Sequence, residues 1–80
     1  MQITLVAFGI SKDILGASSL TYELREPATV TGLLDQLNQD YPEFKRLASI
    51  RVAVNEEYAS NELAISEHDE VVLIPPVSGG

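Results

Sequence analysis

Residues 29–42 read TVTGLLDQLNQDYP and hold the one clear amphipathic helix of this chain. Apolar side chains recur at the spacing of one helical face, at Val30, Leu33, Leu34, Leu37 and Tyr41. Thr29 can cap the first turn, and Pro42 ends the helix because a residue before proline disfavours helical geometry. One helix must therefore cover whatever sheet the rest of the chain forms.

Four stretches around this helix have the composition of β-strands. They are residues 2–8, 19–25, 50–55 and 71–74, and a short return strand can form at residues 58–59. A short helix or a tight turn is expected over residues 10–15, with Gly16 as a plausible C-cap. This order predicts an α+β fold in which one main helix crosses a mixed sheet of four to five strands, and the β-grasp is the most economical candidate.

Composition limits the classes of function. The 80 residues suffice for one small domain, and 45% of them are hydrophobic, which is ordinary for a folded protein. There is no cysteine, which excludes disulfides and fits a reducing, cytoplasmic setting. Twelve acidic and five basic residues give a net charge of −7, so we expect no nucleic acid as a partner. The charge indicates either a basic protein partner or a requirement for solubility alone. No membrane span or secretory signal is expected.

Residues with conventional catalytic or metal-binding chemistry are sparse. His68 lies alone in the acidic turn at residues 66–70, where a solvated turn residue is a better interpretation than a metal ligand, and we assign it no role. The Asp and Glu residues lack the spacing of paired acid–base groups. We expect no metal site, no cofactor bound by this chain alone and no catalysis by the chain on its own.

The most informative segment is the end of the chain, IPPVSGG at residues 74–80. Pro75 and Pro76 enforce an extended exit from the last strand, and the four residues beyond them reach about 13 Å at full extension. Gly79 and Gly80 can thread a narrow channel because they have no side chains. We expect a β-grasp domain over residues 1–76 and a flexible Gly-Gly tail over residues 77–80; the alternative is an ordinary frayed terminus.

Both faces of two strands are apolar. Residues 71–74 are all aliphatic, and residues 5–8 of the first strand have apolar side chains on alternate sides. A single helix covers only one face of a sheet. Either side elements fill the second face or part of it forms an exposed patch, and we favour a patch that binds a partner.

A set of short segments follows in order along the whole chain: Phe8 with KDILG at residues 12–16, VAVN at 52–55, DEV at 69–71 and PPVSGG at 75–80. In this order and over this length the chain resembles the small sulfur-carrier subunits of molybdopterin synthase. The closing segment is the most specific. The family often has glycine at the position of His68.

The resemblance implies a ubiquitin-like β-grasp fold and chemistry at the tail. An adenylating enzyme similar to ubiquitin-activating enzymes would use ATP and Mg²⁺ to activate Gly80, which then becomes a thiocarboxylate. The large catalytic subunit of molybdopterin synthase would receive the tail in a heterotetramer, and the sulfur would go to cyclic pyranopterin monophosphate. Gly79 would be the second threading glycine, and the partner interface would comprise Phe8, Tyr58, Ile74, Pro75, Pro76, Val77 and Ser78.

Three other functions compete with this one. A related sulfur carrier for thiamine thiazole synthesis also ends in Gly-Gly, although it typically lacks the Pro-Pro-Val approach. A ubiquitin-like protein modifier would join Gly80 to a lysine through an isopeptide bond. A β-grasp binding module would make no use of its tail at all.

Overall fold

The computed structural model describes residues 1–47 and 50–75. The elements follow in the order β1 (Gln2–Ala7), α1 (Gly9–Leu15), β2 (Ser19–Glu23), α2 (Val30–Asp40), the 3-10 helix η1 (Pro42–Arg46), β3 (Arg51–Val54), β4 (Glu57–Tyr58) and β5 (Glu70–Ile74). Each strand and α-helix expected from the sequence is present, with ends that differ by one or two residues. The helix η1 has no counterpart among the elements expected from the sequence.

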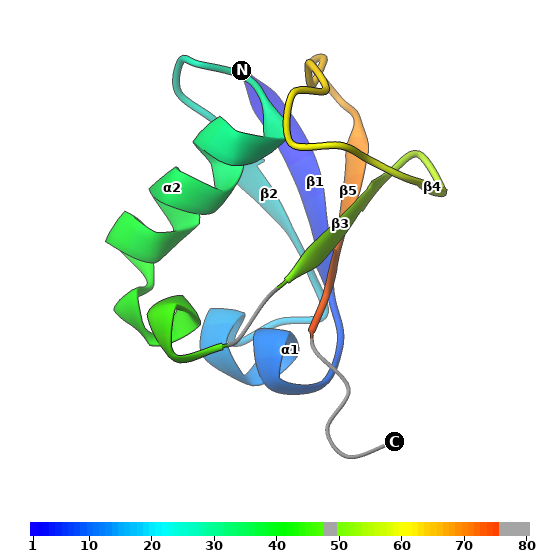
Figure 1. Cartoon of the computed structure of the whole chain (residues 1–80). Helices are drawn as coiled ribbons and strands as arrows, with labels where there is room; N and C mark the ends of the chain where they lie inside the picture. Colours follow the sequence, from blue (N-terminus) through cyan, green and yellow to red (C-terminus); the bar gives the residue numbers. More distant parts are fainter. Residues whose placement is uncertain (48–49, 76–80) are drawn as a thin grey trace.

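The five strands form one mixed sheet in the order β2-β1-β5-β3-β4. The central strands β1 and β5 are parallel, and the pairs β1–β2, β5–β3 and β3–β4 are antiparallel. Figure 1 shows α2 crossing one side of this sheet, with α1 and η1 at the end where β5 finishes. This arrangement is the ubiquitin-like β-grasp, which confirms the predicted fold class.

Helix α2 begins and ends as its sequence predicts. Thr29 is the N-cap, and its Oγ1 accepts a hydrogen bond of 3.1 Å from the backbone N–H of Gly32. Tyr41 is the C-cap and donates its N–H to the carbonyl oxygen of Leu37 at 2.7 Å. Pro42 follows and starts η1. The buried face of α2 comprises Val30, Leu33, Gln36 and Leu37.

The core lies between α2 and the inner face of the sheet. Every second residue of the two central strands points into it, and these side chains have at most 1% of their surface exposed: Ile3, Leu5, Ala7, Val71 and Leu73. Strand β3 adds Val52 and Val54, and η1 adds Phe44, whose ring packs edge-on against Tyr41. The inner face is therefore filled by the fold itself.

The two ends of the sheet differ. At the end where β1 and β5 begin, the turn at Asn55 bonds to the turn before β5. The Asn55 side chain donates to Asp69 Oδ1 and accepts from the N–H of Glu70, both at 3.0 Å. Strand β5 ends at Ile74, at the opposite end of the sheet from these turns (Figure 1), and Pro75 follows it there.

None of the helices in the described part of the chain is long and apolar enough to cross a bilayer.

Candidate functional site

The side of the sheet opposite α2 carries a continuous apolar surface, which we call the outer face. The strand register places Val6 beside Val72, Val72 beside Ala53, and Ala53 beside Tyr58. Ser19 of β2 extends the same row at its other end. Val6 and Val72 are half-buried although no element lies over them among the described residues. The predicted apolar patch is therefore present, and side elements do not fill it.

Phe8 and Ile74 extend the outer face toward the tail. Phe8 follows β1 directly and keeps an extended backbone, with φ −129° and ψ 156°, so its side chain is on the same side as Val6. Ala7 pairs with Leu73 in the parallel register of β1 and β5. Phe8 and Ile74, the next residue of each chain segment, therefore lie beside each other. Phe8 is 57% exposed and Tyr58 is 69% exposed, unusually high values for large apolar rings. The structure thus places Phe8, Tyr58 and Ile74 on one surface.

Pro75, the last residue that the structure describes, lies beside Gly9 at the start of α1. Gly9 has φ +55°, and a Cβ built there would be 3.7 Å from Cγ of Pro75. Any other residue at this position would be strained in the left-handed conformation. Pro75 is half-buried at the edge of the outer face. The remaining tail residues of the predicted site, Pro76, Val77, Ser78, Gly79 and Gly80, lie outside the described residues.

Sequence analysis missed one residue of the outer face. Arg51 is on β3 opposite Ile74, and its guanidinium carbon is 5.0 Å from the centroid of the Tyr58 ring. Arg51 and Ala53 are two positions apart in one strand, so they share a face. The alternation of side chains along residues 51–54 was the signal in the sequence. It showed neither which face of the sheet was open nor that β4 places Tyr58 beside Arg51.

His68 lies away from this surface and has a structural explanation. It adopts φ +69°, and its N–H donates to the carbonyl oxygen of Gln2 at 2.8 Å in the turn before β5. Glycine, frequent here in the family that the sequence resembles, adopts this conformation without strain. Across residues 1–47 and 50–75 no group of three His, Cys, Asp or Glu side chains could hold a metal ion.

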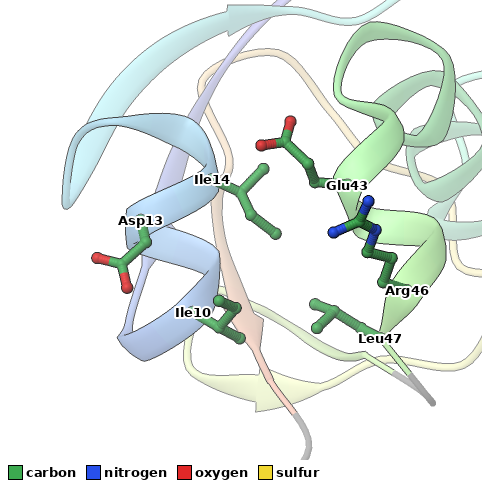
Figure 2. Close-up of a pocket in the computed structure, with 6 residues that line it drawn as sticks. All are labelled: Ile10, Asp13, Ile14, Glu43, Arg46 and Leu47. Carbon is green, nitrogen blue, oxygen red and sulfur yellow. The ribbon is translucent and has the colours of Figure 1, made fainter.

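A second surface feature is a hollow of about 240 Å³ between α1 and η1. Figure 2 shows Ile10 and Ile14 extending from α1 toward the side that carries Leu47, whereas the carboxylate of Asp13 points away from the hollow. Glu43 and Arg46 of η1 complete its lining. The hollow is close to Pro75, because its lining residue Ile10 follows Gly9, the residue that approaches Pro75.

The fold and the outer face define a ubiquitin-like β-grasp protein with an open apolar sheet surface that ends at its C-terminal segment. Residues 6–80 match the model of the ThiS family, and the chain belongs to that family. Two relatives are named molybdopterin synthase sulfur carrier subunit. The one from Chlamydomonas reinhardtii is 35% identical over 100% of both chains, and the one from Arabidopsis thaliana is 30% identical over 100% of this chain and 84% of its own.

Solved structures show the same fold. The putative molybdopterin converting factor subunit 1 from Pyrococcus furiosus superposes with a TM-score of 0.84 at 24% identity, covering 96% of this chain and 99% of its own. The small archaeal modifier protein 1 from Haloferax volcanii gives 0.78 at 26% identity, over 95% and 98%. A complex of subunits 1 and 2 of the molybdopterin-converting factor from Helicobacter pylori gives 0.66 at 21% identity, over 100% of both chains.

Proposed function

We propose that this chain is the sulfur carrier subunit of a molybdopterin synthase. The observation that carries the proposal is the outer face, an apolar surface with exposed Phe8 and Tyr58 that reaches Ile74, the residue before Pro75. In the sequence, Pro75 is followed within five residues by the terminal Gly-Gly. A carrier needs this combination because one protein surface must be recognised while the chain end enters that protein's active site. The full-length relatives named as such carriers support the same function.

The proposed chemistry takes place at Gly80. A carboxylate oxygen of Gly80 attacks the α-phosphate of ATP in an adenylating enzyme with Mg²⁺, and pyrophosphate leaves. Sulfide from a donor then attacks the acyl carbon and displaces AMP, which leaves a thiocarboxylate. Adenylation is needed because an ordinary carboxylate oxygen is a poor leaving group. The thiocarboxylate would give its sulfur to cyclic pyranopterin monophosphate, two carriers supplying the two sulfurs of one dithiolene.

The proposed main partner is the large catalytic subunit of molybdopterin synthase, in a heterotetramer. The Helicobacter pylori complex of subunits 1 and 2 supports a partner of this kind. In the proposal Phe8, Tyr58 and Ile74 contact the large subunit, and Pro75 directs Pro76, Val77, Ser78, Gly79 and Gly80 into its active site. The same surface would meet the adenylating enzyme, so the two partners would bind in turn and not together.

Intact mass spectrometry tests the chemistry. The purified chain is incubated with the adenylating enzyme of its own organism, Mg²⁺-ATP and sulfide under neutral, non-reducing conditions. We expect one terminal oxygen to be replaced by sulfur, and the variant lacking Gly80 to remain unmodified. Because α2 and the core do not involve Gly80 in the described contacts, the variant should melt like the wild type. An unmodified wild-type chain alongside an active control carrier would contradict the proposal.

A second candidate function is protein modification. The similarity to the small archaeal modifier protein 1 supports it specifically. A modifier would form isopeptide bonds between Gly80 and lysines, so denaturing gels of host lysate would show higher-mass species that contain this chain. Thiamine thiazole synthesis remains the alternative destination of the sulfur. Restoring molybdoenzyme activity to a host deleted for its own carrier, without restoring thiamine independence to a thiazole mutant, would support molybdopterin.

A further inference from the structure

Arg51 is the cation of the outer face. Among the residues of β1 to β5 that the structure describes, no other side chain is positively charged. Its guanidinium stacks on the ring of Tyr58 at 5.0 Å, and across the sheet it pairs with Ile74. An arginine is therefore fixed between two residues of the proposed partner interface, in a chain whose net charge is −7.

The environment of Arg51 decides what its charge can do. Its neighbours on the outer face are apolar: Tyr58, Ile74 and, two residues further along β3, Ala53. Within the described part of the chain no carboxylate forms an ion pair with it. In the free protein the guanidinium is exposed to water. A partner that covers the apolar surface would remove that water, and an unpaired buried charge is strongly unfavourable.

We propose that the protein partner covering the outer face presents an Asp or Glu carboxylate to Arg51, within an otherwise apolar contact surface. The inference rests on the proposed function, in which this partner is the large subunit of molybdopterin synthase. Tyr58 holds the guanidinium in place before binding, so less side-chain freedom is lost when the carboxylate arrives. The pair would fix how the two surfaces align, because apolar contacts alone define alignment poorly.

In the proposed ion pair this chain supplies the positive charge and the partner the negative one. The overall attraction between the two proteins has the opposite signs. Twelve acidic residues favour a basic partner overall, whereas Arg51 requires an acidic group at one point of that partner. A partner with the opposite pattern would meet both a repulsive overall field and an unpaired guanidinium. Arg51 is accordingly a specificity residue as well as a contact residue.

Calorimetric titration with the purified large subunit of the same organism tests the inference. The variants are Arg51→Leu and Arg51→Glu. The control is Lys45→Glu, which makes the same change of charge at an exposed residue of η1. We expect Arg51→Glu to weaken binding about 100-fold and Arg51→Leu about 10-fold, since each leaves the partner's carboxylate unpaired in the interface. Lys45→Glu should change the dissociation constant by no more than about 3-fold. Thermal melting of each free variant checks the fold.

The outcomes separate this inference from the proposed function, with Phe8→Asp as a fourth variant. If Arg51→Leu binds as tightly as the wild type or more tightly, or if Arg51→Glu is no weaker than Lys45→Glu, the inferred carboxylate is absent. Loss of binding by Phe8→Asp in that same experiment would leave the proposed interface standing. If Phe8→Asp also binds normally, the outer face is not the docking surface and the proposed function loses its structural basis. Recovery of Arg51→Glu by a Glu→Arg or Asp→Arg change in the large subunit would identify the partner residue.

Discussion

Gln36 is a buried polar residue that joins helix α2 to the edge of the sheet. Its Nε2 donates to the carbonyl oxygen of Glu23 at 2.7 Å, and its Oε1 accepts from the N–H of Arg25 at 2.8 Å. The side-chain amide of Gln36 thus satisfies two backbone groups at this edge of the sheet, which a neighbouring strand would otherwise have to bond. It also explains why β2 ends at Glu23, two residues before the alternating pattern of the sequence ends.

Replacing Gln36 by leucine should destabilise the fold strongly. The change leaves one carbonyl and one N–H without their partner at a partly buried site, and we expect a loss of about 2–4 kcal/mol in the free energy of unfolding. Urea denaturation followed by circular dichroism measures it. The control is Gln39→Leu, an exposed position on the same helix, which should change stability by less than about 0.5 kcal/mol. Equal stabilities for the two variants would contradict this explanation.

Tyr22 makes stability depend on pH in the alkaline range. Burial, and then the 2.6 Å hydrogen bond from its hydroxyl to Asp40 Oδ2, raise the pKa of Tyr22 above its ordinary value of 10.0. Unfolding releases the hydroxyl to titrate normally. The stabilisation is therefore fully present below about pH 10 and is lost as the pH rises above it.

The variant Tyr22→Phe tests this dependence. At neutral pH it should lose about 1 kcal/mol with the hydrogen bond. Above pH 10 its stability should fall less steeply than that of the wild type. Urea midpoints measured from pH 7 to pH 11 give both slopes, and Tyr58→Phe, at an exposed ring, should follow the wild-type curve. A Tyr22→Phe curve parallel to the wild type throughout would show that another group dominates.

Helix α2 depends on a close approach at Gly32. A Cβ at this position would be 2.0 Å from the carbonyl oxygen of Pro27, so the backbone of the preceding loop would have to move. Alanine usually stabilises a helix relative to glycine by about 1 kcal/mol. Here the contact reverses the sign, because the helix and the loop are packed directly against each other.

We therefore expect Gly32→Ala to lower the free energy of unfolding by about 1–3 kcal/mol. Thermal unfolding by calorimetry measures the change, and Gln39→Ala, on the exposed side of α2, should be neutral or slightly stabilising. A stabilised Gly32→Ala protein would mean that the loop at Pro27 adjusts at no cost.

The elements differ in how much of them could be predicted from sequence. Helix α2 and the strands were predicted because their patterns are local: the apolar spacing after Val30, the alternation in β2, and prolines at the ends. The helix η1 and the hollow beside it were not, since they depend on packing between distant segments. The outer face was predicted from the two apolar sides of β1 and β5. The contact between Arg51 and Tyr58 needed the register of β3 and β4.

The charge of the whole molecule is unevenly distributed. Residues 1–51 contain all five Lys and Arg residues and six of the twelve acidic ones, whereas residues 52–80 contain the other six acidic residues and no Lys or Arg. Several of these later acids lie at the end of the sheet away from Pro75: Glu56 and Asp69 in the turns there and Glu70 at the start of β5. The end of the sheet opposite Pro75 is thus the strongly negative one.

Association with the proposed large subunit should therefore depend on salt. We expect the association rate to fall about 10-fold between 50 and 500 mM NaCl, because a negative protein and a basic partner attract each other over long range. Stopped-flow fluorescence measures the rate. A double variant, Glu56→Gln with Glu62→Gln, should associate more slowly at low salt and at the wild-type rate at high salt. An association rate that does not change with the salt concentration would exclude a basic partner surface.

The position of β5 has a mechanical consequence. The tail continues from the central strand of the sheet, which is bonded to β1 on one side and to β3 on the other. A partner that pulls on Pro75 along the direction of β5 puts force on the hydrogen bonds to β1 and to β3 at the same time. These bonds lie across the pulling direction, so β5 can move only if many of them break together. An edge strand would peel away one bond at a time. The domain should therefore withstand traction on Pro75 while the proposed adenylating enzyme acts on Gly80.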